Sequence, residues 1–360
     1  MDTLLPQRLF VGMTIESEIP PEILFEHRGA VGLITLNRPK ALNALTLGML
    51  TAMRAQLTKW AGDPAVECVV IRGAGERAFC AGADIRAIRQ SGLDGTSYAV
   101  DFFREEYQLN AAIRHYPKPY IALIHGICMG GGIGVSVHGQ YRIAGSTAVF
   151  AMPETGIGFL PDVGGSNFLS RCPGQIGLYL GLTGDRLDTR DALYVRLATH
   201  WVPSDEWPVL LDALERGDNP RDVTLELDRR PQNSALSERR TKIDRIFSAT
   251  SVEDCLTLLD RDDKDWSHDL AALMRARSPT SLKLTYSQIR MGSGLEFDDC
   301  MRMEFRIASR ILQGHDFYEG VRAVIIDKDN APRWQPATLT EVEDSDVQAY
   351  FAPLEQELPL

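Results

Sequence analysis

The sequence of 360 residues predicts an α/β fold followed by a helical C-terminal region. Helix-like and strand-like patterns alternate from about residue 22 to about residue 202, which is typical of α/β proteins. The apolar runs Cys68 to Arg72 and Tyr120 to Ile124 have the length of buried strands. From Ser204 onward the pattern turns helical and more charged. Periodicity alone does not distinguish a doubly wound sheet from other α/β arrangements.

The first predicted element is a β-hairpin. Ile23 to Leu36 reads as two strand-like segments around Arg28-Gly29, and it ends at Asn37-Arg38-Pro39. The residues before it, 1–21, show no clear pattern and are predicted to be an N-terminal leader.

Two glycine-containing turns each follow a strand-like run and precede a helix-like one. The first is Ala78-Phe-Cys-Ala-Gly-Ala-Asp-Ile85, and the second contains Gly130, Gly131 and Gly132. A glycine turn at a helix N-terminus exposes N–H groups and a partial positive charge. If the two turns face each other, they form an oxyanion hole, in which one donor typically contributes roughly 3–4 kcal/mol. The alternative for either turn is an ordinary tight connection between strand and helix.

Two carboxylates, Glu154 and Asp162, follow the second turn. Pro153, Gly156 and Pro161 predict that the stretch around them is a loop, and loops often carry catalytic groups. Two neighbouring carboxylates repel each other, so the pKa of one should rise, and that group can donate a proton while the other accepts one. The alternative is a pair of solvated loop charges.

The segments AFCAGADI (Ala78 to Ile85) and HGICMGGGIG (His125 to Gly134) resemble the two signature turns of the crotonase, or enoyl-CoA hydratase/isomerase, superfamily. The resemblance begins at about Ile23 and implies a crotonase-type spiral of ββα repeats with a helical C-terminal region. It also implies that the N–H groups of Ala83 and Gly131 hold a thioester carbonyl. Further residues implied at the substrate are Gly82, Asp84, Ile85, Arg86, Glu106 and Gly130.

Within the superfamily, Pro153-Glu154-Thr155 together with Pro161-Asp162-Val163-Gly164-Gly165 resembles the 3-hydroxyisobutyryl-CoA hydrolase branch. Further segments that agree are SPTSLK (278–283), GHDFYEGVRA (314–323), IDKD (326–329) and PRWQP (332–336). The resemblance implies hydrolysis of a short branched 3-hydroxyacyl-CoA, namely 3-hydroxyisobutyryl-CoA in valine catabolism. It implies no cofactor, because CoA is part of the substrate. 3-Hydroxypropionyl-CoA would fit the same chemistry.

The carboxylates separate the reactions of the superfamily. Hydratases use two glutamates, and this chain has Gly134 at the first of these positions and Glu154 at the second. Glu154 is therefore the predicted principal catalyst of hydrolysis, either as nucleophile or as general base. Asp162 would orient the substrate 3-hydroxyl or move a proton. The alternatives are an enoyl-CoA hydratase or isomerase, and a catalytically silent CoA-binding protein.

Composition limits the partners of the protein. The net charge of −11 disfavours nucleic-acid binding, whereas the phosphates of CoA need local basic groups, for which Arg86, Lys328 and Arg333 are candidates. The spacing of His125 and His138 predicts no metal site.

Cys80 and Cys128 lie beside the turns, but nothing around them indicates a lowered thiol pKa. A thiol nucleophile is therefore disfavoured, and both cysteines are expected to be small apolar residues.

No apolar run reaches transmembrane length and no signal-like start is present, so a cytoplasmic protein is expected, with a homo-oligomer left open. The predicted division is a catalytic core over 22–202, a helical connecting region over 203–277 and a helical region over 278–360 that covers the acyl pocket. Within the connecting region, Asp218 to Pro231 is predicted to be a mobile connection because it is rich in Asp, Arg and Pro.

Overall fold

The computed structural model describes residues 20–231 and 233–360. All but the last two residues of the predicted leader therefore lie outside the described residues. The predicted hairpin is confirmed, since β1 (Ile23–Arg28) pairs antiparallel with β2 (Val31–Leu36).

The strands form two sheets. The larger sheet has the order β1-β2-β3-β5-β7-β9, and every pair after the hairpin is parallel. The smaller sheet has the order β4-β6-β8 and is parallel throughout. The bounds are β3 (Cys68–Gly73), β4 (Ala78–Cys80), β5 (Tyr120–Ile124), β6 (Ile127–Met129), β7 (Tyr141–Ala144), β8 (Val149–Ala151) and β9 (His200–Trp201).

Each repeat along the chain gives one strand to each sheet. The pairs β3 and β4, β5 and β6, and β7 and β8 each place their first strand in the larger sheet and their second in the smaller one. This arrangement confirms the expected spiral of ββα units. The sequence predicts a direct passage from strand to glycine turn, whereas the structure inserts β4 and β6 there. Strands of three residues are too short to show a period of two.

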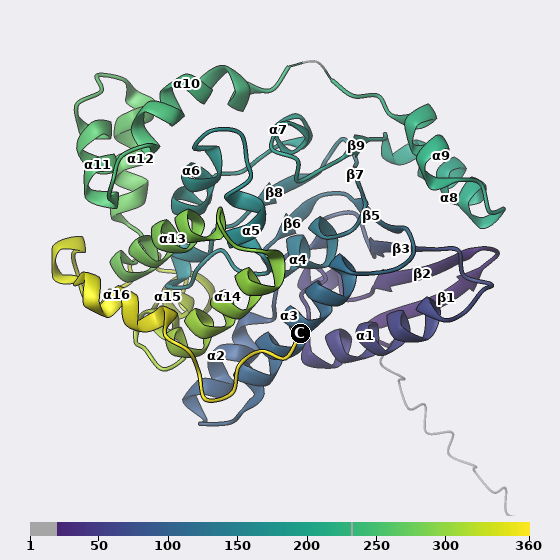
Figure 1. Cartoon of the computed structure of the whole chain (residues 1–360), viewed down its shortest axis with the longest axis horizontal. Helices are drawn as coiled ribbons and strands as arrows, with labels where there is room; N and C mark the ends of the chain where they lie inside the picture. The colour runs from purple at the N-terminus through teal and green to yellow at the C-terminus, as the bar shows by residue number, and fades with distance from the viewer. Residues whose placement is uncertain (1–19, 232) are drawn as a thin grey trace, which may run out of the picture.

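Helices surround the sheets and make up the C-terminal half (Figure 1). In the view of Figure 1, β1, β2 and α1 lie on the right, while α10 to α12 and α16 lie on the left. The first half contains α1 (Leu47–Ala61), α2 (Ile85–Leu93), α3 (Tyr98–Arg114), α4 (Gly131–Val137), α5 (Gly165–Leu169), α6 (Ile176–Thr183) and α7 (Thr189–Tyr194), with the short turns η1 (Pro39–Ala41) and η2 (Glu154–Ile157). The second half contains η3 (Ser204–Glu206), α8 (Trp207–Glu215), α9 (Pro220–Leu227), α10 (Ala235–Phe247), α11 (Val252–Asp260), α12 (Asp265–Arg275), α13 (Pro279–Gly292), α14 (Phe297–Ile311), α15 (Asp316–Val321), η4 (Arg322–Ile326), η5 (Leu339–Glu341) and α16 (Asp344–Phe351).

Both faces of the larger sheet are covered. All six residues of β2 are buried, as expected for a parallel sheet between two layers. On one face, alternate residues such as Val31 and Leu33 pack in one apolar cluster with Leu210 and Leu214 of α8. The helical connecting region therefore begins by covering this face of the catalytic core.

The segment predicted to be a mobile connection contains a helix. The Asn219 side chain accepts a hydrogen bond from the Arg221 N–H, and Pro220 occupies the first turn of α9. Asn before Pro is a helix start signal, so the prediction of a connection over Asp218 to Pro231 is wrong for α9.

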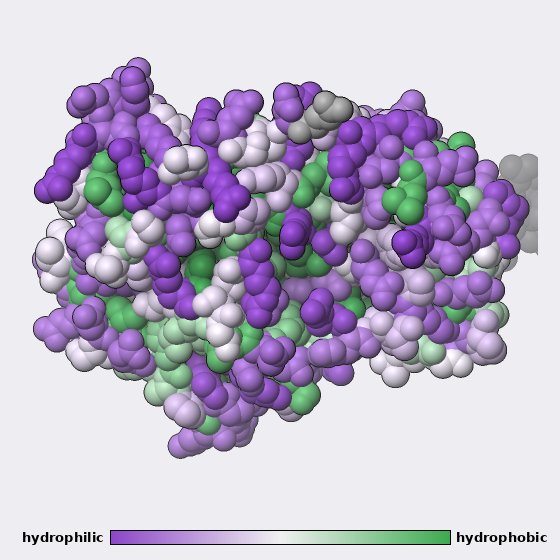
Figure 2. Space-filling view, turned by 45° about the horizontal axis from the view of Figure 1, so that its top comes forward, coloured by the Kyte–Doolittle hydropathy of each residue, from purple (hydrophilic) through white to green (hydrophobic). Residues whose placement is uncertain are grey.

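Within the described residues, no helix is both long enough and apolar enough to cross a bilayer. Figure 2 shows a face dominated by hydrophilic side chains, with apolar ones in separate small groups and in a hollow near its middle.

Candidate active site

The two glycine turns face each other, as the oxyanion-hole interpretation requires. A Cβ on Gly132 would lie 2.2 Å from the Cys80 carbonyl oxygen, and a Cβ on Gly82 would lie 3.5 Å from the Gly131 nitrogen. Gly82 and Gly130 have φ angles of 103° and 49°, which favour glycine. The glycines are therefore needed because the two backbones touch.

Two backbone donors are free at this contact. Within the part of the chain that the structure describes, the N–H groups of Ala83 and Gly131 donate to no backbone acceptor. Gly131 is the first residue of α4, where an N–H has no partner inside the helix. Both residues line one cavity, so a substrate carbonyl oxygen can accept from both.

The cavity has a volume of about 360 Å³. Its wall is mostly apolar, from Ile85, Phe103, Met129, Ile157, Phe159, Val324 and Ile325. Its polar side chains are Glu106, Glu154, Asp162, Arg277 and Asn330. A largely apolar wall with a few convergent polar groups is typical of a small-molecule site.

Glu154 is the first residue of η2 and is 7% exposed. A Cβ on Gly130 would lie 3.0 Å from Glu154 Oε1, so the carboxyl reaches the second glycine turn. Glu154 Oε2 has no hydrogen-bond partner among the described residues. One oxygen of this carboxyl is thus free to act on a substrate held beside the turn.

Asp162 is fixed by a residue that the sequence analysis did not single out. The Tyr107 hydroxyl donates to Asp162 Oδ2 at 2.7 Å, and both side chains are buried. Tyr107 lies on α3 next to Glu106, and no pattern in the sequence indicates that it reaches a loop 55 residues further on.

The loop after Asp162 is held by buried polar groups. Val163 and Gly164 have φ angles of 51° and 88°. Glu304 on α14 accepts from the N–H groups of Gly164 (2.7 Å) and Ser166 (2.8 Å). His138 Nε2 lies 2.7 Å from the Val163 carbonyl oxygen. His138 is therefore a structural histidine, as expected, and Glu304 is a supporting residue that sequence reasoning missed.

Glu106 is the third carboxyl of the site and is 1% exposed. A Cβ on Gly131 would lie 2.3 Å from Glu106 Oε1, which has no hydrogen-bond partner among the described residues. Gly130 and Gly131 thus leave the space that the carboxyls of Glu154 and Glu106 occupy. Glu106 lines the same cavity as Glu154 and Asp162, and its role at a substrate stays a prediction.

The pKa values of all three carboxyls are raised by their surroundings. Burial, with a smaller contribution from Asp162, raises the pKa of Glu106 and of Glu154 well above the ordinary range. Burial also raises the pKa of Asp162 to about 7, although the Tyr107 hydroxyl opposes this rise. Coupled groups of this kind hold an ionised and a protonated carboxyl together, which supplies a base and an acid in one site.

The position of Gly134 has no room for a glutamate. A Cβ there would lie 2.8 Å from Val163 Cβ and 3.0 Å from Asn110 Nδ2. The loop that carries Asp162 therefore fills the place where the hydratase pattern has its first glutamate.

Some of the predicted substrate-binding residues line the cavity, and others do not. Gly82, Ile85 and Gly130 line the cavity. Asp84 does not line it: its carboxylate caps α2 and pairs with Arg38 at 3.0 Å. We therefore correct its predicted role at the substrate, because its side chain is committed to these structural contacts.

The cations expected at the CoA phosphates do not line the cavity either. Arg86 is exposed and donates to the Ile325 carbonyl oxygen, and Lys328 and Arg333 are exposed. The cationic side chain in the wall is Arg277, which lies against Gly156 and donates to the Thr183 carbonyl oxygen at 2.9 Å. No motif surrounds Arg277, so the sequence gives no signal for it.

The remaining candidates have structural roles. Burial raises the pKa of the Cys80 thiol to about 12 and also raises that of Cys128, so neither is a thiolate at neutral pH. His125 Nε2 lies 2.8 Å from the Gly75 carbonyl oxygen. The raised thiol pKa values agree with the expectation that Cys80 and Cys128 are not nucleophiles.

A spiral of ββα repeats with two free backbone donors and buried carboxyls defines a protein of the crotonase class. The family profile described as enoyl-CoA hydratase/isomerase matches residues 31–351. The chain belongs to the enoyl-CoA hydratase/isomerase family.

Within this family, the chain is 48% identical over 355 residues to the protein named 3-hydroxyisobutyryl-CoA hydrolase, mitochondrial, of Danio rerio, covering 96% of this chain and 93% of the relative. It is 44% identical over 353 residues to the protein of the same name from Homo sapiens, covering 95% and 91%.

Two solved structures share the fold closely. A carnitinyl-CoA dehydratase from Mycobacterium thermoresistibile has a TM-score of 0.90 at 42% identity and covers 94% of this chain and 98% of its own. An enoyl-CoA hydratase from Rhodobacter sphaeroides has a TM-score of 0.89 at 38% identity and covers 94% and 100%. The fold is therefore shared with proteins named as a dehydratase and a hydratase, so the reaction follows from the site and not from the fold.

Proposed function

We propose that the protein is an acyl-CoA thioester hydrolase whose substrate is a short branched 3-hydroxyacyl-CoA, 3-hydroxyisobutyryl-CoA. The observation that carries the proposal is the group of three buried carboxyls beside two free N–H donors. The similarity to proteins named for this hydrolysis, over nearly the whole chain, supports the same substrate.

The chemistry follows from the geometry. The thioester carbonyl oxygen accepts from the N–H groups of Ala83 and Gly131, which stabilise the charge that develops when the carbonyl carbon is attacked. Once Glu154 has lost its proton, it either attacks this carbon, giving a mixed anhydride that water then hydrolyses, or removes a proton from the attacking water. A protonated carboxyl of the group gives its proton to the departing CoA sulfur. Asp162 orients the 3-hydroxyl or moves the proton.

Hydration of a C=C bond is the second candidate, and the names of the two similar proteins of known structure favour it. It requires a glutamate at the position of Gly134, where Val163 and Asn110 leave no room. A silent CoA-binding protein would have no need for buried carboxyls that lack hydrogen-bond partners, since burying such groups is costly.

The test is thiol release from 3-hydroxyisobutyryl-CoA by the wild type, by Glu154→Gln and by the control Glu355→Gln, which changes an exposed glutamate. We expect release by the wild type and the control, and a loss of at least ~10²-fold in Glu154→Gln. Crotonyl-CoA is run in parallel. Loss of its C=C absorbance without thiol release would establish a hydratase and refute the proposal.

The reaction as proposed needs no cofactor beyond the CoA of the substrate, so dialysis against EDTA should leave the rate unchanged. The compartment stays a prediction: a cytoplasmic protein is the expectation from the sequence, whereas the curated relatives are named mitochondrial, and fractionation of cells separates the two. A homo-oligomer also stays a prediction, which light scattering tests.

A further inference from the structure

Part of the cavity wall has a strained backbone. Val324 and Ile325, which line the cavity, belong to the π-helical turn η4, in which the Asp327 N–H donates to the Arg322 carbonyl oxygen at 2.8 Å. Asn330, also in the wall, has a φ of 52°. π-turns and left-handed residues other than glycine are unfavourable and persist where surrounding contacts hold them.

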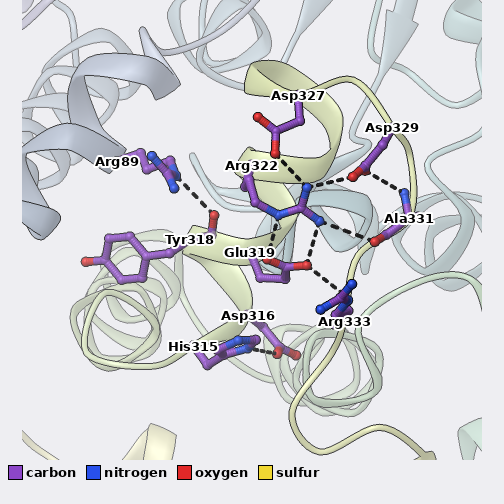
Figure 3. Close-up of polar contacts among 10 residues, drawn as sticks. All are labelled: Arg89, His315, Asp316, Tyr318, Glu319, Arg322, Asp327, Asp329, Ala331 and Arg333. Carbon is purple, nitrogen blue, oxygen red and sulfur yellow. Dashed lines mark hydrogen bonds and ion pairs between the residues drawn. The ribbon is translucent and has the colours of Figure 1, made fainter.

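The Arg322 side chain supplies these contacts (Figure 3). Its guanidinium donates twice to Glu319 on α15, both at 2.8 Å, and to Asp327 (2.8 Å) and Asp329 (2.7 Å) in the following loop. Glu319 also accepts from the Arg333 N–H at 2.8 Å. One arginine thus ties the loop that follows the π-turn to α15.

The helix α15 is itself fixed at the catalytic loop. A Cβ on Gly158 would lie 2.3 Å from the Asp316 carbonyl oxygen, and a Cβ on Gly320 would lie 2.4 Å from the Ile157 carbonyl carbon. The two glycines therefore allow α15 to contact the turn that carries Glu154. From the other side, Arg89 of α2 donates to the Tyr318 carbonyl oxygen at 3.1 Å (Figure 3).

We propose that Arg322 is a positioning residue for acyl-CoA binding: by clamping residues 322–331 to α15, it holds Val324, Ile325 and Asn330 in the cavity wall. The proposal rests on the proposed function, since it concerns the same cavity. The segment carries neither the oxyanion donors nor the carboxyls, so the clamp acts on substrate binding and leaves the chemical step intact. Without the Arg322 clamp, residues 322–331 adopt several conformations, and only one of them completes the cavity wall. The apparent affinity for acyl-CoA then falls in proportion to the population of that conformation.

The kinetic test compares Arg322→Gln with Arg322→Lys and with Arg302→Gln. Arg302 is the matched control, because it pairs with Asp299 across the same spacing of three residues on α14 at 2.9 Å and does not line the cavity. We expect Arg322→Gln to raise KM about tenfold with kcat within about twofold, since a tenfold loss of the competent population lowers affinity tenfold. Arg322→Lys should recover part of the loss, because lysine keeps the charge without the fork of donors.

A second measurement follows the segment directly. Lys328 is exposed in the clamped loop, with a φ of 58°. We expect trypsin to cleave after Lys328 faster in Arg322→Gln than in the wild type, and CoA to slow this cleavage. Unchanged KM, or a loss confined to kcat, would overturn the proposal, as would equal cleavage in both proteins. Because cleavage is measured without turnover, it still tests the clamp if the wild type releases no thiol.

Discussion

Replacing Asp162 by Asn should stabilise the folded protein at alkaline pH while abolishing most of its hydrolysis. Asn has nearly the same shape as Asp, and its carbonyl oxygen can still accept from the Tyr107 hydroxyl, which donates at 2.7 Å in the wild type. The substitution therefore removes the charge and keeps the packing. Removing an ionisable group that is costly to bury should raise the free energy of unfolding at every pH at which that group is charged.

The magnitude follows from the pKa of Asp162, which burial raises from 3.8 to about 7. A raised carboxyl pKa means that the folded state binds the proton more tightly than the unfolded chain. Stability is then fully present below pH 3.8 and falls as the pH rises toward 7. The stability lost through ionisation of Asp162 is about 4 kcal/mol at pH 8 and less than about 1 kcal/mol at pH 4. The entropy of unfolding of a chain of this length converts about 4 kcal/mol into a Tm rise of about 5 °C.

The assay is thermal unfolding of wild type and Asp162→Asn at pH 8 and at pH 4, with Asp263→Asn as the control at an exposed aspartate. We expect a gain of about 5 °C at pH 8 that nearly disappears at pH 4. A gain of equal size at both pH values, or a less stable variant at pH 8, would refute the argument that Asp162 is costly to ionise in the folded protein.

Three further changes test other parts of the site. Tyr107→Phe removes the donor that favours ionised Asp162, so the acidic limb of the pH–rate profile should move to higher pH, and an unmoved limb would contradict this role. Gly131→Ala places a Cβ 2.3 Å from Glu106 Oε1 beside one oxyanion donor, so kcat should fall ~10²-fold or more, and a kcat near that of the wild type would count against this donor. Gly134→Glu should lower the Tm without giving crotonyl-CoA hydration, whereas measurable hydration would show that the loop can make room.

Local signals in the sequence predicted the parts of the site that lie close together along the chain. The glycine turns, the hairpin and the loop with Glu154 and Asp162 are all read from residues within a short window, and the structure has each of them. The spiral arrangement came from family resemblance, because periodicity identifies strands and not the sheet that each strand joins.

The supporting contacts could not be predicted in this way. Tyr107 lies 55 residues before Asp162, and Glu304 lies 140 residues after Gly164, yet each pair shares a hydrogen bond. Such pairs are set by how helices pack on the core, and a single side chain on an amphipathic helix looks the same whether it is solvated or buried. Arg277 lies in the link between α12 and α13 with no motif around it, and the motif that contains Arg322 gives no sign of the contacts that its side chain makes.

The loop from Pro161 to Gly165 explains how one fold can support different reactions. Its Val163 side chain fills the space beside Gly134, which removes one hydratase carboxylate, and its Asp162 supplies another carboxyl next to Glu154. The loop thus excludes an acid at the position of Gly134 and places a different one, Asp162, in the cavity wall. Besides burial, the Asp162 carboxylate raises the pKa of both Glu106 and Glu154, so this carboxyl also affects how firmly the two glutamates hold their protons. Thioester hydrolysis needs a base or nucleophile and an acid for the departing sulfur beside a polarised carbonyl, and a protonated and an ionised carboxyl at this site can supply both.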